Sequence, residues 1–224
     1  YTYSTFNKNM KEKEVYVNKD RNIKVTFMGK IDKVLYKEED DITYLVVIDY
    51  KTGSTNINLK NMEYGLGLQL PIYLYLSSKM ELKNVKVVGF YLQKLFNTTL
   101  DNSKDYDTAK ENNLRLEGYS IDEENILSKF DTTYNDSKLI KGMKITSKGF
   151  SSYSKVLSEE EINDMLDNTD KLIDKAIDNI LEADFEINPK VINVSCSFCE
   201  YRDICYLREK DKVYINKDGE DNGD

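Results

Sequence analysis

A continuous apolar run at residues 43–48 (TYLVVI) limits the fold of this chain more than any other segment. A run without polar alternation predicts a strand that is buried on both faces. Such strands occur in sheets that are covered by helices on both sides, because only there do both rows of side chains leave water. The run therefore predicts an α/β fold with a mixed central sheet.

Other segments supply the remaining strands. β-Branched, alternating stretches at residues 14–18 and 23–36 predict strands before the apolar run, and Val85–Leu95 predicts one after it. Between the second stretch and the run, the acidic residues 38–41 predict a turn. The two strands that flank this turn are expected to form a hairpin.

Two helices are expected beside the sheet. Residues 58–80 have helical periodicity, and Pro71 is expected to kink or restart that helix. Ser158 and Glu161 form a capping-box pattern that opens a second, amphipathic helix. The predicted apolar stripes are Leu66, Leu70, Tyr73 and Leu74 in the first helix, and Ile162, Met165, Leu166, Ile173, Ala176, Ile177 and Ile180 in the second.

Composition divides the chain into three parts. Residues 1–195 are expected to form one α/β domain, and residues 101–155 within it are interpreted as a polar, irregular excursion from the core. Residues 196–210 hold all three cysteines, and residues 211–224 form a polar tail that is expected to fray. Because the chain does not begin with Met, we expect it to be part of a longer protein.

Missing residue types exclude several functions. The chain has no histidine, so Ser-His-Asp triads, HExxH zinc sites and histidine bases are excluded. It has neither an apolar run of the roughly 18 residues that cross a bilayer nor a signal-peptide pattern, so no membrane partner is expected. Abundant lysine and few, clustered cysteines predict a reducing, cytoplasmic location.

The net charge of −8 argues against nucleic-acid binding if it is taken as an average. Residues 1–100 carry 15 basic and 11 acidic side chains, a net charge of +4, whereas residues 101–224 carry 17 and 29, a net charge of −12. One interpretation is a solvated acidic helix face followed by a polar tail. The other is a polarised surface that is positive around a functional site, which leaves nucleic acid open as a substrate.

A carboxylate–lysine set lies at the ends of the predicted hairpin strands. Asp49 ends the apolar run, where an uncompensated charge is costly, and Lys51 leaves the strand on the same face. The hairpin could bring Asp32 close to Asp49. Two carboxylates suit Mg²⁺ or Mn²⁺, and a neighbouring lysine could stabilise developing charge or orient an attacking water. The alternative is a turn residue at Asp32 and a surface ion pair between Asp49 and Lys51.

Gln69 and Tyr73 are four residues apart and share one face of the first predicted helix. An amide and a phenol there could position a nucleotide phosphate, a base or a metal-bound water. The alternative is ordinary helix packing.

Taken together, these residues form three ordered motifs, Gly29-x-x-Asp32, Asp49-Tyr50-Lys51 and Gln69-x-x-x-Tyr73. The order resembles the PD-(D/E)XK nucleases, specifically their RecB-type branch. A C-x2-C-x5-C pattern, made by Cys196, Cys199 and Cys205, follows and resembles the iron–sulfur staple of AddB-type nuclease domains. Residues 64–70 and 114–119 are also similar to that type, so the resemblance covers nearly the whole chain.

The resemblance implies a PD-(D/E)XK core and a metal-dependent DNA exonuclease domain. Its implied setting is an ATP-dependent helicase–nuclease that repairs double-strand breaks by recombination, with single-stranded DNA at the site and an AddA-like helicase subunit as partner. Asp32, Asp49 and the backbone carbonyl of Tyr50 would bind Mg²⁺ or Mn²⁺. Lys51 would assist the water or the charged transition state, and Gln69 and Tyr73 would position the nucleotide.

For the cysteines, the resemblance implies a structural [4Fe–4S] cluster held by Cys196, Cys199 and Cys205. Such a cluster needs four thiolates, and in the family the fourth lies upstream of the nuclease motifs, here before Tyr1. Zinc and metal-free thiols are the alternatives. Many RecB-type nucleases also have a histidine before the first aspartate; Glu14 could occupy that region here.

Two other functions fit the same motifs. One is a stand-alone nuclease of CRISPR adaptation, which belongs to the same branch and carries a similar cysteine cluster. The other is a DNA-binding module that keeps a nuclease fold without catalysis.

Overall fold

The structure is a computed structural model. It describes residues 4–5, 13–17, 23–27, 30–53, 57–80, 82–95, 105–190, 196–197 and 199–215. In the first three ranges only the backbone is described, apart from the half-buried side chain of Val25.

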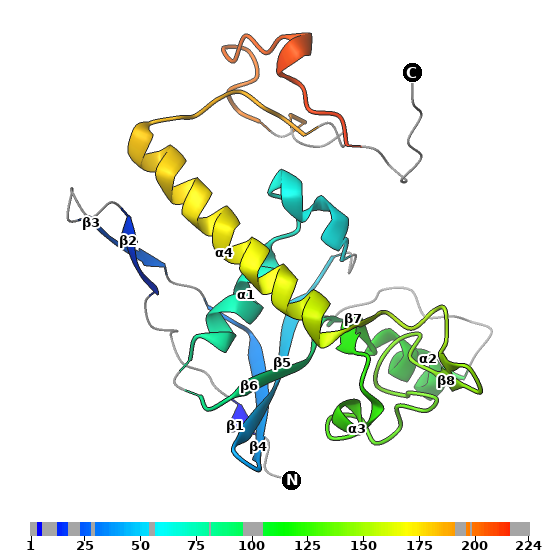
Figure 1. The fold of residues 1–224 in the computed structure, drawn as a ribbon. Helices are drawn as coiled ribbons and strands as arrows, with labels where there is room; N and C mark the ends of the chain where they lie inside the picture. Colours follow the sequence, from blue (N-terminus) through cyan, green and yellow to red (C-terminus); the bar gives the residue numbers. More distant parts are fainter. Residues whose placement is uncertain are drawn as a thin grey trace.

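A six-stranded mixed sheet forms the centre of the fold, with the strand order β1-β4-β5-β6-β7-β10 (Figure 1). The pairs β1–β4, β4–β5 and β6–β7 are antiparallel, whereas β5–β6 and β7–β10 are parallel. This arrangement confirms the predicted mixed sheet. The strands are β1 (Ser4–Thr5), β4 (Lys33–Glu39), β5 (Ile42–Lys51), β6 (Val85–Lys94), β7 (Leu116–Ile121) and β10 (Val156–Leu157).

Two short hairpins lie outside this sheet. One pairs β2 (Lys13–Val17) with β3 (Ile23–Phe27), and the other pairs β8 (Ile145–Thr146) with β9 (Gly149–Phe150). The stretch predicted as one strand at residues 23–36 is therefore two strands, β3 and β4, that belong to different sheets. The turn after β4 is made by Asp40 and Asp41 alone, both with positive φ.

The apolar run forms the middle of β5 and confirms the prediction of a strand buried on both faces. Leu45, Val46, Val47 and Ile48 are all buried. The strand is antiparallel to β4 on one side and parallel to β6 on the other. A parallel neighbour requires a crossover connection, and that connection carries the next helices.

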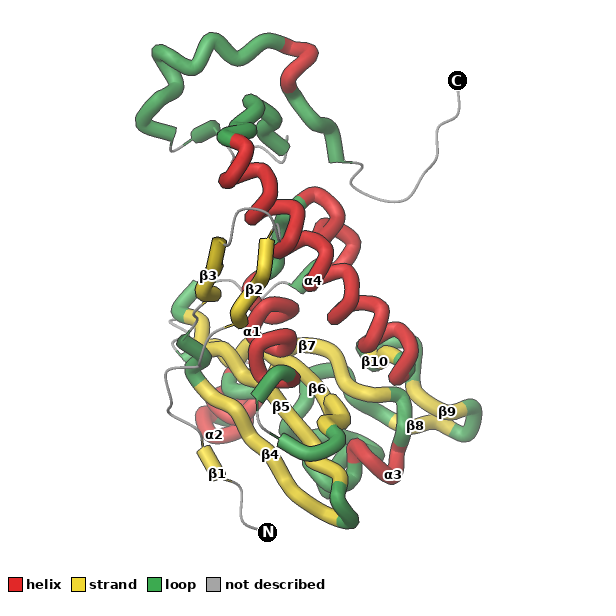
Figure 2. The backbone as a smooth tube through the Cα atoms, turned by 60° about the vertical axis from the view of Figure 1, so that its left-hand side comes forward, coloured by secondary structure: helices red, strands yellow, loops and turns green. Residues whose placement is uncertain are grey.

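Helices α1 (Gln69–Ser78) and α4 (Glu159–Glu182) stack on one face of the sheet (Figures 1 and 2). Leu70 and Leu74 of α1 join the main apolar core, and Tyr75 and Leu76 pack with Ile173 and Ile177 of α4. Helices α2 (Tyr106–Asn113) and α3 (Glu124–Leu127) precede and follow β7.

The helix predicted over residues 58–80 is in fact two helices. A 3₁₀ helix, η1 (Leu59–Tyr64), is capped by the Asn58 side chain, and Gly65 ends it in the left-handed region with φ 74°. Pro71 is the third residue of α1, where a backbone N–H has no partner within the helix, so it is tolerated there. Leu66 lies between the helices and does not share the apolar face of α1.

Helix α4 begins as predicted. The Ser158 side chain accepts from Glu161 N at 3.1 Å, and Glu161 Oε2 accepts from Ser158 N at 2.7 Å. Of the predicted apolar stripe, Ile162, Met165, Ile173 and Ile177 are buried, whereas Ile180 is 61% exposed. Ala176 is exposed as well.

The interval 101–155 is not an irregular excursion throughout. Its strand β7 lies in the main sheet, where a Cβ on Gly118 would meet Phe90 O at 2.1 Å, so only glycine fits against β6. The Ser120 hydroxyl hydrogen-bonds to Tyr91 OH at 2.7 Å in the core. The sequence concealed this strand because its six residues include Glu117 and Gly118 and polar segments flank them.

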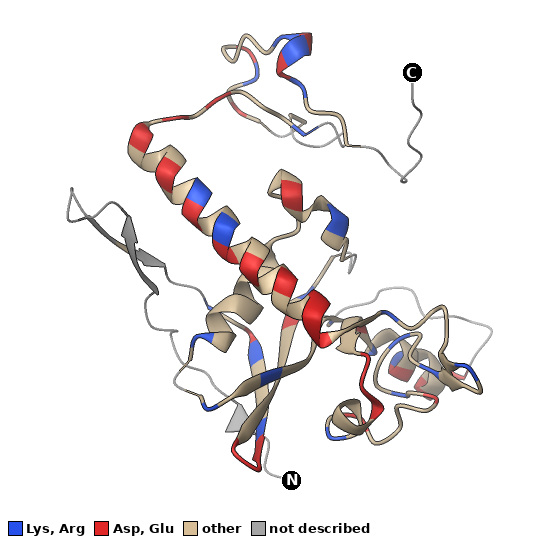
Figure 3. Ribbon diagram, viewed as in Figure 1, with Lys and Arg blue, Asp and Glu red and all other residues tan. Residues whose placement is uncertain are grey.

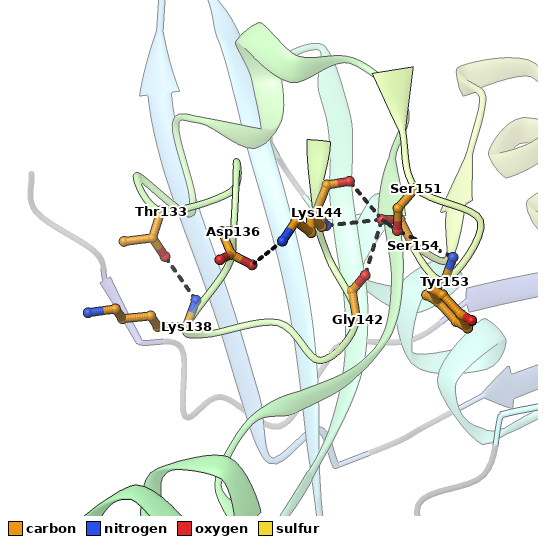
Figure 4. Close-up of polar contacts among 8 residues, drawn as sticks. All are labelled: Thr133, Asp136, Lys138, Gly142, Lys144, Ser151, Tyr153 and Ser154. Atoms are coloured by element: carbon orange, nitrogen blue, oxygen red, sulfur yellow. Dashed lines mark hydrogen bonds and ion pairs between the residues drawn. The ribbon is translucent and has the colours of Figure 1, made fainter. Parts of the chain in front are cut away.

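Side chains order the loops of the same interval through contacts to the backbone (Figure 4). Ser154 Oγ lies 3.2 Å from the carbonyl oxygens of Gly142 and Lys144 and accepts from Lys144 N at 3.0 Å. Thr133 Oγ1 accepts from Lys138 N at 3.2 Å. These bonds replace regular secondary structure in satisfying the backbone.

Beyond the end of α4, residues 196–197 and 199–215 lie away from the sheet and include a short 3₁₀ helix, η2 (Glu209–Asp211) (Figure 1). A bridge between Lys190 and Val213 ties the two sides of this segment together. Residues 216–224 of the predicted tail lie outside the described residues. Among the described helices, none has the length and apolar composition needed to cross a membrane.

Candidate active site

The β4–β5 hairpin brings the two predicted carboxylates together. Lys33 pairs with Ile48, so Asp32, which directly precedes β4, lies beside the end of β5. There Tyr50 N donates to Asp32 Oδ2 at 2.9 Å. The antiparallel register thus places Asp32 next to Asp49, as the sequence predicted.

Asp49 and Lys51 point to the same face of β5 and form an ion pair, with 2.8 Å between Asp49 Oδ2 and Lys51 Nζ. The Asp49 side chain is 3% exposed, whereas that of Lys51 is 28% exposed. The carboxylate is thus buried, and the lysine connects it to solvent. A surface ion pair, the alternative considered for these residues, does not describe this geometry.

Helix α1 begins at Gln69 and directs that side chain toward the carboxylate. Gln69 Nε2 donates to Asp49 Oδ1 at 3.1 Å and lies 3.1 Å from Tyr73 OH, one turn further along the helix. Lys51 Nζ in turn donates to Gln69 Oε1. Gln69 therefore links Asp49, Lys51 and Tyr73 in one hydrogen-bonded cluster.

The electrostatics of Asp49 distinguish it from an ordinary paired carboxylate. Burial raises the pKa of Asp49 above its usual range; Lys51 acts in the opposite direction, and the charge of Asp32 adds to the rise. Its Oδ2 is buried and accepts no hydrogen bond from the residues that the structure describes, leaving the Lys51 ion pair as its contact. The site thus holds more negative charge than its hydrogen bonds compensate.

The residues present fit a divalent cation. A buried carboxylate oxygen without a hydrogen bond, next to a second carboxylate, is a hard oxygen donor set of the kind that Mg²⁺ and Mn²⁺ prefer. Within the described ranges, no group of three or more Asp, Glu, Cys or His side chains could hold a metal. Asp32 and Asp49 would therefore leave most coordination positions to water and substrate, which suits Mg²⁺.

Two other parts of the sequence-based site are not placed. Gly29 lies outside the described residues, and Glu14 is described only as backbone in β2. The carbonyl of Tyr50 remains a predicted ligand. Sequence reasoning also overlooked Lys94, which ends β6 in register with Lys51; the signal available was the matching position of the two lysines at the ends of neighbouring apolar strands.

The three cysteines carry free thiols and lie in the segment beyond α4. Cys199 N donates to Cys196 O at 3.4 Å, which forms a turn, and Cys199 is exposed. In the described part of the chain they do not converge with other ligands on a metal position. The iron–sulfur cluster stays a prediction that needs a fourth ligand from outside this chain.

Comparison with known proteins identifies the family to which this cluster belongs. The profile of the PD-(D/E)XK nuclease superfamily matches residues 4–206. The chain belongs to the PD-(D/E)XK nuclease superfamily. The resemblance inferred from the three motifs is thereby confirmed, and the mixed sheet with helices is consistent with a PD-(D/E)XK nuclease fold.

The chain is also similar to individual proteins, each of which is named as the AddB-type subunit of an ATP-dependent helicase/deoxyribonuclease. It is 30% identical over 202 residues to the protein from Carboxydothermus hydrogenoformans, which covers 85% of this chain and 18% of that protein. The values are 29% over 194 residues for Alkaliphilus metalliredigens, with 81% and 17% covered, and 28% over 211 residues for Caldanaerobacter subterraneus, with 89% and 18% covered. The chain thus spans less than a fifth of the length of these relatives.

Proposed function

We propose that this chain is a Mg²⁺- or Mn²⁺-dependent deoxyribonuclease domain that acts as an exonuclease in an ATP-dependent helicase–nuclease. The observation that carries the proposal is the buried Asp49 carboxylate, which lies beside Asp32, Lys51 and Gln69 at the open end of the central sheet. Membership of a nuclease superfamily gives that cluster its chemistry, the hydrolysis of phosphodiester bonds.

In this proposal Asp32 and Asp49 hold the metal. A bound divalent ion supplies Lewis-acid stabilisation of phosphate charge and lowers the pKa of water at the site. Burial of Asp49 strengthens its attraction for a cation, because less water screens the charge. The Tyr50 N–H fixes the orientation of the Asp32 carboxylate.

Lys51 is the group that would contact the reacting phosphate. Its ammonium is held between Asp49 and Gln69, so its position is fixed before substrate arrives. A lysine has three N–H donors, and these two contacts leave one for a phosphate oxygen or the attacking water. A positioned cation stabilises the charge that develops on the phosphoryl oxygens.

Gln69 and Tyr73 position the other groups. Gln69 orients Asp49 through its amide nitrogen and Lys51 through its amide oxygen. Tyr73 OH is the acceptor of a Gln69 N–H, which leaves the phenol hydrogen available to a nucleotide. Neither side chain is needed to transfer a proton in this scheme.

The similar proteins are named as subunits of a helicase/deoxyribonuclease, and this supports the proposed partners. We infer that a helicase subunit delivers single-stranded DNA to the site during double-strand-break repair. The cysteines Cys196, Cys199 and Cys205 would share a [4Fe–4S] cluster with a fourth cysteine of a longer chain. Anaerobic purification of that longer protein should give a brown product, and a colourless zinc protein would contradict the cluster.

The function is tested by incubating end-labelled single- and double-stranded DNA with the purified chain in Mg²⁺, Mn²⁺ or EDTA. The wild type should cleave DNA only with a divalent metal, and Asp32→Ala or Lys51→Ala should lower the rate by about 10²-fold or more. Lys33→Ala, whose side chain leaves the other face of the sheet, is the matched control and should keep the wild-type rate.

The time course distinguishes an exonuclease, which releases short products from the start, from an endonuclease. DNA binding without metal-dependent cleavage would contradict the proposal and favour a non-catalytic binding module. Unchanged cleavage by the Asp32→Ala and Lys51→Ala variants would show that the site assignment is wrong.

A further inference from the structure

The end of β6 holds a second lysine beside the candidate site. In the parallel β5–β6 pair, Asp49 is in register with Leu92 and Lys51 with Lys94. Residues in register on adjacent strands project to the same face of a sheet, and such strands lie about 4.8 Å apart. Lys94 therefore leaves the sheet on the face that carries Asp49 and Lys51, one strand further along.

The backbone fixes Lys94 in that position. The β5–β6 ladder continues to the last residue of each strand, and Leu95 N donates to Lys51 O at 2.9 Å just beyond it. The Lys94 side chain starts from a rigid strand and not from a loop. Residue 94 is half-buried, so little of its freedom remains to be lost when a ligand binds.

The charge of Lys94 is not compensated within the described part of the chain. It makes no hydrogen bond or ion pair with any residue that the structure describes. The other two lysines of this strand pair differ: Lys51 is paired with Asp49, and Lys86 lies 3.0 Å from Glu123 and 2.9 Å from Glu159. A half-buried lysine without an anion, in a chain rich in acidic residues, needs one from elsewhere.

We propose that Lys94 binds a backbone phosphate of the DNA strand, next to the phosphate held at Lys51. This inference rests on the proposed nuclease function and extends the site by one residue. Lys51 is already engaged with Asp49 and Gln69, so its remaining donor serves one phosphate. Lys94, one strand away on the same face, supplies the charge for the neighbouring phosphate of a strand that crosses the ends of β5 and β6.

Such a contact predicts a specific pattern of binding. A lysine on a phosphate contributes to affinity for every sequence and releases one counterion, so its removal reduces the salt dependence of binding by about one counterion. It should not distinguish one base from another. Lys94 is therefore a positioning residue whose loss weakens DNA binding more than the chemical step.

The test measures the affinity for a fluorescent single-stranded oligonucleotide by anisotropy, in Ca²⁺ to prevent turnover and over a series of salt concentrations. Lys94→Ala should weaken binding by about tenfold and flatten the salt dependence, and Lys94→Arg should restore most of the affinity. Lys33→Ala is the control, because it removes a half-buried lysine from the opposite face of the same sheet. It should change affinity less than about twofold.

The outcomes are separable from those of the nuclease test. The proposal fails if Lys94→Ala binds DNA like Lys33→Ala, if Lys94→Arg is no better than Lys94→Ala, or if the wild type does not bind DNA. A wild type that binds through Lys94 and yet cleaves nothing would support phosphate binding while overturning the nuclease function. Thermal melting of each variant establishes that it is folded.

Discussion

Two buried aspartates of this chain differ in how their charge is compensated. Asp131, 4% exposed, follows α3 and accepts from Thr133 N at 2.8 Å, from Thr133 Oγ1 at 2.7 Å and from the Ser137 hydroxyl. Asp49, 2% exposed, accepts from Gln69 on one oxygen and forms an ion pair with Lys51 on the other. Asp131 is satisfied by neutral donors of its own loop, whereas Asp49 keeps an oxygen without a hydrogen bond.

The difference teaches how to separate a structural carboxylate from a functional one. Hydrogen bonds from Thr133 and Ser137 hold the loop in shape, and nothing remains for a ligand. At Asp49 the fold accepts a raised pKa and an unsatisfied oxygen, a combination that is costly unless a cation uses it. The mean charge of the chain gives no hint of this contrast. Figure 3 shows many acidic residues on α4 and at the β4–β5 turn, far from any such arrangement.

The largest expected effect is on catalysis. Asp49→Ala should lower metal-dependent DNA cleavage by about 10³-fold, because it removes a metal ligand. Asp131→Ala should leave the rate per folded molecule within about twofold. Initial rates on end-labelled single-stranded DNA, corrected for the folded fraction, measure both. A comparable loss in the two variants would remove the distinction between the aspartates.

The next effect is on stability and has the reverse order. Asp131→Ala should lower the free energy of unfolding by about 2–4 kcal/mol, since it leaves buried donors of Thr133 and Ser137 without acceptors. Urea denaturation followed by circular dichroism measures the change. A loss below about 0.5 kcal/mol would show that the loop does not depend on this carboxylate.

A smaller, opposite shift is expected for Asp49→Asn without metal. Burial raises the pKa of Asp49, so the ionised carboxylate costs folding free energy at neutral pH, and the neutral amide avoids that cost. The melting temperature should rise by about 2–4 °C, the change that about 1 kcal/mol produces at this size. The gain should shrink as pH falls through the raised pKa, because the wild type then becomes neutral too. A lower melting temperature in EDTA at pH 7 would contradict the account of Asp49.

The smallest effect concerns Tyr73. Tyr73→Phe removes only the hydroxyl that lies 3.1 Å from Gln69 Nε2, so cleavage should fall by about two- to tenfold, with the change mostly in KM. Tyr75→Phe is a control on the same helix; its hydroxyl donates to Asp170 of α4, and its loss should affect stability and not KM. Equal KM values for wild type and Tyr73→Phe would place the phenol outside the substrate site.

The sequence predicted the cluster well because its members lie on regular elements at short, fixed offsets. Asp49 and Lys51 are two apart on a strand, and Gln69 and Tyr73 are four apart on a helix, so local periodicity determines which side chains share a face. Only the pairing of Asp32 with Asp49 needed a non-local assumption, the hairpin, which the acidic turn indicated.

The features that the sequence did not predict depend on long-range pairing. Strand β7 takes its place from the fit of Gly118 against Phe90, and Lys94 gains significance only from its register with Lys51. Helix α4 runs as predicted, but its periodicity does not show where the sheet and α1 stop covering it, so Ile180 was wrongly assigned to the buried stripe. The hydrophobic pattern sets faces, and the tertiary fold sets their limits.

The most direct test of the central claim is the cleavage of single-stranded DNA by Asp49→Asn in Mg²⁺, measured on a sample whose melting curve is recorded first. The account predicts a variant that is at least as stable as the wild type and that cleaves about 10³-fold more slowly. A folded Asp49→Asn protein that cleaves at the wild-type rate would show that the buried carboxylate of β5 is not part of the active site.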